Sequence, residues 1–145
     1  MMFEFTGTYE HSLDTKGRLT LPASFREHIN SSKEARLAVG LNRCIAIYPL
    51  PVWLNLLENM KSVPKTDQQA LAFKRVLFPT AYPCDVDGQG RILVPASLRE
   101  IAAIVREVTV IGQQDYIEVW DRAKWKEYFR ESLEKYEQNA GNLHL

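Results

Sequence analysis

The sequence predicts a mainly β fold with peripheral helices, an α+β chain in which one small β-rich unit is used twice. One segment recurs without a gap, short strand patterns surround both copies, and amphipathic helical patterns lie between and after them. A small open β unit cannot bury both faces of its strands alone. We therefore expect the two copies to interleave their hairpins about a pseudo-two-fold axis, within one compact structural domain.

The internal repeat aligns residues 14–27, DTKGRLTLPASFRE, with residues 87–100, DGQGRILVPASLRE. Asp, Gly, Arg, Pro, Ala, Ser, Arg and Glu recur in place, and the apolar exchanges are conservative. The match extends upstream, where Tyr9 aligns with Tyr82. It also extends downstream once the alignment of the two copies is shifted by one residue. Self-similarity over so much of the chain indicates a duplicated structural unit.

Each copy predicts a strand, a turn, a second strand, a short helix and two further strands. Asp14 and Gly17 supply turn chemistry, because Asp accepts backbone amides two residues on and Gly allows a positive φ. Pro22 and Pro95 end a strand and suit the start of a short helix. Strands are expected over residues 8–13, 18–21, 36–40, 44–48, 108–112 and 116–120.

Helical patterns connect the copies and follow the second one. Residues 51–61 place apolar side chains on one face, and Thr66-x-x-Gln69 predicts a capping box that opens a helix running towards Leu77. Asp121 is expected to cap a last helix. Its aromatic-rich stripe is more typical of core packing or a subunit contact than of a ligand site, and consists of Trp125, Phe129, Leu133 and Tyr136.

These patterns divide the chain into four segments. We expect the first repeat over 7–54, a helical connector over 55–80, the second repeat over 81–126, and a C-terminal helix and tail over 127–145.

The composition is that of an ordinary globular protein, with 46% hydrophobic and 25% charged residues. No segment approaches the roughly 18 continuous apolar residues of a membrane span. The N-terminus carries Glu4 where a signal peptide has positive charge. We therefore expect a cytoplasmic protein with no membrane partner. The 18 basic and 18 acidic residues cancel, so composition lends no support to nucleic-acid binding, and the case rests on local pattern.

Reactive residue types are scattered along the chain. Cys44 and Cys84 lie far apart, and no histidine stands at metal-ligand spacing from them. No Ser/His/Asp or Cys/His set can be assembled, and no glycine-rich phosphate loop precedes a helix. We expect two buried or half-buried cysteines that act as small hydrophobes, with no redox or metal role. We also expect a protein that is not an enzyme and uses no metal, no cofactor and no small-molecule substrate.

The paired Asp-x-x-Gly-Arg segments, the offset between copies and the run from Ile47 to Trp53 resemble the MraZ family of the AbrB-like swapped-hairpin superfamily. The resemblance covers almost the whole chain. It implies a tandem swapped-hairpin β-barrel and a cytoplasmic, nucleoid-associated DNA-binding transcription regulator. It further implies a homo-oligomeric ring that binds direct repeats in double-stranded DNA, upstream of the cell-division and cell-wall gene cluster that includes its own gene.

With this resemblance, the two Asp-x-x-Gly-Arg loops become the candidate DNA-binding site. The planar fork of Arg18 matches the O6/N7 edge of guanine in the major groove, and Lys16 suits a phosphate. The candidate DNA-binding residues are Thr15, Lys16, Gly17, Arg18, Gln89 and Arg91, and the candidate loop-orienting residues are Asp14, Asp87 and Gly90. Gly88-Gln89 in the second copy makes that loop less cationic than the first. Arg26 and Arg99 are expected to pair with neighbouring glutamates.

Three other interpretations stay open. The Asp–Arg pairs can be surface ion pairs that only tie down each hairpin, worth about 0–1 kcal/mol. Related β architectures also host enzymes, so the fold alone excludes no reaction. The chain can also be a protein-interaction or antitoxin-like module that binds through its aromatic C-terminal helix.

Overall fold

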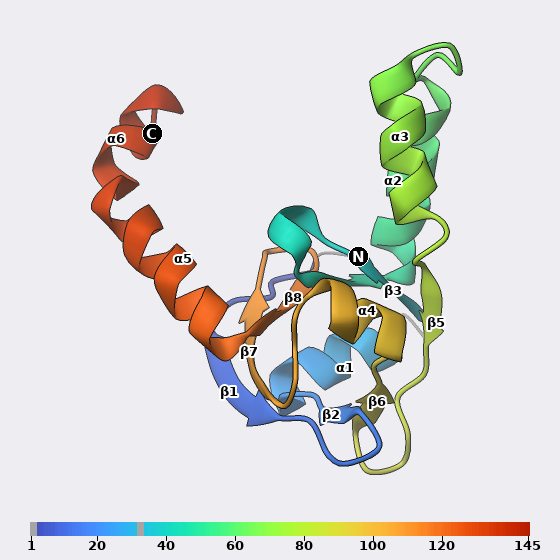
Figure 1. Ribbon diagram of the computed structural model, residues 1–145, viewed down its shortest axis with the longest axis vertical. Coiled ribbons are helices and arrows are strands. Elements are labelled where there is room, and N and C mark those ends of the chain that lie inside the picture. Colours follow the sequence, from blue (N-terminus) through green and yellow to red (C-terminus); the bar gives the residue numbers. More distant parts are fainter. Residues whose placement is uncertain (1–2, 32–33) are drawn as a thin grey trace.

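The computed structural model describes residues 3–31 and 34–145, and it has the mixed α+β architecture that the repeat predicts (Figure 1). The strands are β1 (Thr8–Ser12), β2 (Arg18–Thr20), β3 (Ala35–Val39), β4 (Ile45–Pro49), β5 (Tyr82–Cys84), β6 (Arg91–Leu93), β7 (Glu107–Gly112) and β8 (Ile117–Asp121). The helices are α1 (Ala23–Ser31), α2 (Leu50–Lys61), α3 (Gln68–Leu77), α4 (Ala96–Ile101), α5 (Arg122–Glu134) and α6 (Tyr136–Asn142), with a short 3-10 turn, η1 (Leu41–Arg43).

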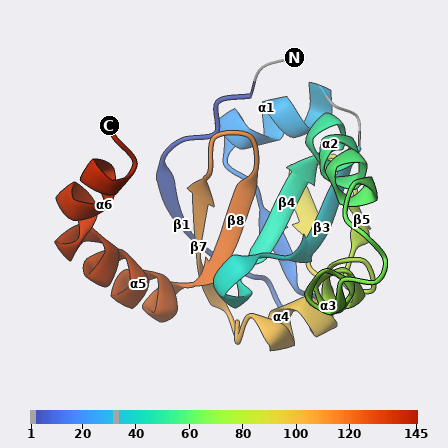
Figure 2. The ribbon, with the colours of Figure 1, turned by 90° about the horizontal axis from the view of Figure 1, so that it is seen from above.

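The strands of the two copies are exchanged. Six of them form one antiparallel sheet in the order β1-β7-β8-β4-β3-β5, which Figure 2 shows from above, and β2 pairs with β6 in a separate ribbon. Strand β1 of the first copy pairs with β7 of the second, and β5 of the second pairs with β3 of the first. The expected interleaving is therefore confirmed.

The two halves are related by a pseudo-two-fold axis that passes between β4 and β8 and between β2 and β6. In the ribbon Arg18 lies opposite Leu93 and Thr20 lies opposite Arg91. Exchanging the two copies therefore leaves the strand pairing unchanged. Outside the strands, a hydroxyl contact of 3.3 Å between Tyr9 and Ser24 recurs as one of 3.4 Å between Tyr82 and Ser97. Equivalent residues of the two copies therefore make equivalent contacts at these positions.

One hydrophobic core joins both copies. The β2–β6 ribbon contributes Leu19 and Ile92, and the short helices contribute Phe25 and Leu98, all at most 2% exposed. They pack with the buried strand residues of the sheet. Full burial of one such side chain stabilises the fold by about 1.5–3 kcal/mol. Both Asp-x-x-Gly-Arg loops therefore begin and end in well-packed structure, which gives them fixed positions.

Two helical arms project from the sheet at the end opposite the loops (Figure 1). Helices α2 and α3 form one arm, and α5 with α6 form the other, at opposite edges of the sheet (Figure 2). The predicted cap of α3 was wrong by one residue: the carboxylate of Asp67, not Thr66, accepts from the amides of Gln69 and Ala70 at 3.0 Å. A carboxylate is the stronger acceptor at a helix N-terminus.

The C-terminal arm begins as predicted, because Asp121 accepts a hydrogen bond from the amide of Lys124 at 3.1 Å. It is interrupted at Lys135, between α5 and α6. The outer part of the stripe is open to solvent, with Phe129 50% exposed, Leu133 55% exposed and Tyr136 66% exposed. Only Trp125 at its base is half-buried, where it packs against the small cluster of Cys44, Ile111 and Trp120. The rest of the stripe therefore does not serve as core within one chain.

Candidate nucleic-acid interface

The first loop, residues 14–17, is held by Asp14. Its Oδ1 accepts from the backbone amides of Lys16 and Arg18, both at 2.9 Å, and its Oδ2 accepts from Arg18 Nε at 2.7 Å. Gly17 has a φ of +80°, a backbone conformation that residues with a side chain rarely adopt. Its amide donates a hydrogen bond to the Asp14 carbonyl at 3.0 Å. One carboxylate thus closes the turn and orients the arginine.

The second loop, residues 87–90, repeats this geometry. Asp87 accepts from the amides of Gln89 and Arg91 at 2.9 Å, and from Arg91 Nε at 2.9 Å. Gly90 has a φ of +77°. The two loops differ in their middle residues and still have the same hydrogen bonds, because these bonds use the shared Asp and Arg side chains, the shared Gly and backbone amides.

Each loop arginine keeps its outer edge available. The Nε of Arg18 and of Arg91 is bound to aspartate, and their side chains are 30% and 27% exposed. Within the described residues the Nη1 and Nη2 groups of both have no hydrogen-bond partner. The pair of Nη groups is one edge of the planar fork, and it can make two parallel hydrogen bonds to one acceptor pair.

Both loops lie at the same end of the body, away from the helical arms (Figure 1). They are tied to each other through the ribbon. The amide of Leu21 donates to the Gly90 carbonyl at 3.0 Å, and the amide of Val94 donates to the Gly17 carbonyl at 2.9 Å. The spacing of the two loops is therefore fixed by backbone hydrogen bonds between the copies.

Arg26 and Arg99 lie across the loop of the opposite copy. A methyl group at Gly17 would stand 3.0 Å from Arg99 Cζ, and one at Gly90 would overlap the guanidinium of Arg26. The expected pairing with neighbouring glutamates was wrong, since neither arginine has an ion-pair partner in the described part of the chain. Strand exchange places each arginine beside the other copy's glycine, a contact that neither copy predicts by itself.

The other loop residues are arranged around the two arginines. Thr15, Lys16 and Gln89 are exposed. The amide and the carbonyl of Gly17 are both used within the fold, whereas the amide of Thr15 has no partner among the described residues. A phosphate at the first loop therefore has Lys16 and the Thr15 amide as available donors.

The remaining reactive groups are inert or scattered. Cys44 and Cys84 are buried free thiols, as expected, and burial raises the pKa of both, that of Cys84 to about 12. The described residues contain no group of three or more His, Cys, Asp or Glu side chains that could hold a metal ion. None of the described helices combines the length and the apolar character needed to span a bilayer.

The loop carboxylates predict a specific pH dependence. The pKa of Asp14 and of Asp87 lies below the ordinary 3.8, chiefly because the backbone amides of Arg18 and Arg91 donate to them, and then because of the arginine side chains. These carboxylates therefore stabilise the folded loops above pH 3.8 and lose this contribution as the pH falls through the lowered values. Amide chemical shifts of Arg18 and Arg91 in an acid titration measure this. Midpoints at or above 3.8 would contradict it.

The exchanged strands and the paired Asp–Arg loops define a duplicated swapped-hairpin protein. The sequence profile of the family described as "MraZ protein, putative antitoxin-like" matches residues 4–76 and again residues 77–143. The chain is 41% identical to the transcriptional regulator MraZ of Moorella thermoacetica and 44% identical to that of Heliobacterium modesticaldum, with 96% of both sequences covered in each comparison. The chain belongs to the MraZ family.

Proposed function

We propose that this protein is a sequence-specific DNA-binding transcription regulator. One observation carries the proposal: two identical arginine forks, each fixed by an aspartate, stand at the same end of the body with their Nη edges open. Such a fork matches the O6/N7 edge of guanine in the major groove, the most common specific base contact. The names of the two relatives, both transcriptional regulators, support this function.

The neutral net charge is compatible with DNA binding, because affinity for phosphates depends on where the charges lie. In this proposal Lys16 and the Thr15 amide contact phosphates, while Arg18 and Arg91 contact bases. Gln89 is the polar counterpart of Lys16 in the second loop. Asp14 and Asp87, with Gly90, shape the loops and do not contact DNA, because phosphates repel carboxylates.

We further propose that the protein works as a closed homo-oligomer. An apolar groove of about 640 Å³ runs between the α2–α3 arm and η1, and its lining includes the exposed side chains of Leu41, Phe73 and Val76. On the other arm, three residues of the aromatic stripe are exposed, Phe129, Leu133 and Tyr136. Large exposed apolar surfaces on a folded chain mark interaction sites. Two different surfaces on one chain associate head to tail, and such contacts generate rings when the rotation closes.

A ring presents several loop pairs to one DNA molecule. One loop makes few phosphate contacts, so evenly spaced direct repeats gain affinity through effective concentration. We propose, from the family resemblance, that these repeats lie upstream of the cell-division and cell-wall gene cluster, including the regulator's own gene. We also propose, from the same resemblance, that the protein acts at the nucleoid in the cytoplasm.

A gel-shift assay on the DNA upstream of the protein's own gene tests the function. We expect this DNA to bind at least about 1,000-fold more tightly than scrambled DNA of equal length, at about 50 and 200 mM salt. The preference should disappear in the double variant Arg18→Ala/Arg91→Ala, with an unchanged circular dichroism spectrum. Equal affinity of the wild type for both DNAs would refute the proposal.

The exposed stripe also favours one alternative, an antitoxin-like interaction module. The module would bind a different protein through α5 and α6. Mass measured by light scattering on the purified chain separates the two ideas, because the regulator proposal requires a homo-oligomer. A stable monomer that co-purifies with one stoichiometric protein partner would favour the module.

A further inference from the structure

An open hollow of about 560 Å³ lies beside the first loop, at the junction of the two copies. It is lined by Leu13, Asp14, Thr15, Arg99, Val105 and Arg106. The first copy supplies the loop residues, and the second supplies the end of α4 and the segment leading into β7. The amide of Leu13 donates to the Arg106 carbonyl at 2.8 Å, so the two walls are joined by a backbone hydrogen bond.

Two arginines in this hollow have no counter-ion among the residues that the structure describes. The guanidinium of Arg99 lies against Gly17, and its Nε is buried with no hydrogen-bond partner in the described part of the chain. Arg106 is exposed, and its side chain has no ion pair or hydrogen bond within residues 3–31 and 34–145. A half-buried charge without a partner costs free energy, and a bound anion would offset that cost.

The nearby carboxylates are already engaged. Glu107 follows Arg106 directly, but its Oε2 lies 2.7 Å from Arg122 Nη1 and accepts from the Ser12 hydroxyl at 3.1 Å. Asp14 also lines the hollow, and both of its oxygens accept hydrogen bonds from the loop and from Arg18. The hollow therefore has a surplus of positive charge.

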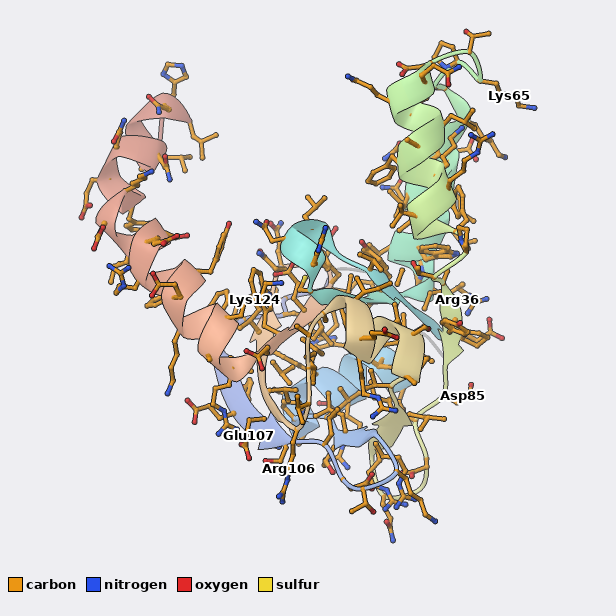
Figure 3. The ribbon with its side chains drawn as sticks, viewed as in Figure 1. Arg36, Lys65, Asp85, Arg106, Glu107 and Lys124 are labelled. Atoms are coloured by element: carbon orange, nitrogen blue, oxygen red, sulfur yellow. The ribbon has the colours of Figure 1, made fainter. Side chains whose placement is uncertain are left out.

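We propose that this hollow binds one backbone phosphate of DNA, next to the base-reading Arg18. The inference rests on the proposed DNA-binding function. Figure 3 shows the side chain of Arg106 at the loop end of the body, directed to the same side as the loops. The unpartnered Thr15 amide stands at the rim of the hollow as a further donor. A phosphate seated here would orient the first loop on the duplex and carry no sequence information.

Salt dependence of DNA binding by the full-length Arg106→Gln variant tests this site. Lys65→Gln is the matched control, because it removes the same charge at the tip of the α2–α3 arm, far from the loops (Figure 3). We expect Arg106→Gln to lower the slope of log K against log salt by about 0.9 for each engaged subunit, with unchanged preference for the upstream DNA. Lys65→Gln should leave the slope unchanged.

Neutral methylphosphonates placed one at a time in the DNA locate the contact. We expect one position in each repeat that weakens binding of the wild type and has no effect on Arg106→Gln. Equal slopes for Arg106→Gln and Lys65→Gln, in a protein that still prefers the upstream DNA, would overturn this site and leave the proposed function standing. Chemical shift changes with inorganic phosphate that depend on Arg106, combined with an unchanged slope, would assign the hollow to a free anion and also overturn it.

Discussion

Replacing Arg18 by alanine should abolish preference for the upstream DNA while the protein stays folded and oligomeric. A two-hydrogen-bond contact between arginine and guanine contributes about 1–3 kcal/mol of discrimination, or about 5- to 150-fold in affinity for each engaged loop. Several loops bind one DNA molecule in the proposed ring, so the losses multiply. Fluorescence anisotropy with upstream and scrambled DNA measures both affinities, and light scattering checks the oligomer.

The matched control is Arg75→Ala, which removes an exposed arginine on α3, at the end of the molecule opposite the loops. It should bind both DNAs as the wild type does. Arg91→Ala should have a smaller effect than Arg18→Ala, because Gly88-Gln89 gives the second loop less positive charge. If Arg18→Ala retains the full preference, the arginine only ties down its loop and the base-reading role is wrong.

A second large loss of DNA binding is expected from a substitution far from the DNA, in the aromatic stripe. Phe129 is 50% exposed, and we propose that it is covered by the groove of the next subunit. Phe129→Asp should yield monomers, because burial of a carboxylate in an apolar groove is costly. A monomer no longer links its loops to those of other subunits. Binding to the repeats should then weaken by about 100- to 10,000-fold, although no loop residue has changed.

Light scattering and anisotropy on the same sample check this result. Lys135→Gln changes the net charge by the same amount at an exposed position at the end of α5, and it should stay oligomeric and bind normally. A second variant, Val76→Asp in the groove, should reproduce the monomer. A monomeric Phe129→Asp that keeps wild-type affinity would show that oligomerisation does not contribute to DNA binding.

Much of the fold follows from the repeat. The similar segments that begin at Asp14 and Asp87 can adopt one local structure, and alternation of apolar residues gives the strands. The need to cover both faces of a small sheet predicts the exchange of strands between copies. The Asp–Arg geometry was also predictable, because a short side chain, a glycine and a basic residue at fixed spacing have few ways to close a turn.

Contacts between the copies were not predictable to the same degree. Arg26 and Arg99 look like helix-surface residues in the sequence, and only the exchanged strands place them on Gly90 and Gly17. The hollow near Arg106 has the same origin, since its walls are distant in sequence. Local competition explains the Asp67 cap, because a carboxylate one position later outcompetes the Thr66 hydroxyl. The division at residues 54, 80 and 126 stays a prediction.

The base-reading claim is tested most directly by measuring the affinity of the wild type and of Arg18→Ala, each for normal repeats and for repeats that carry 7-deazaguanine. This base lacks the N7 acceptor and leaves the phosphates unchanged, so it removes one of the two hydrogen bonds proposed for the arginine fork. We predict that one guanine in each repeat, once substituted, weakens binding of the wild type and leaves Arg18→Ala unaffected. If substitution at every guanine affects both proteins equally, the loops do not read bases and the account is contradicted.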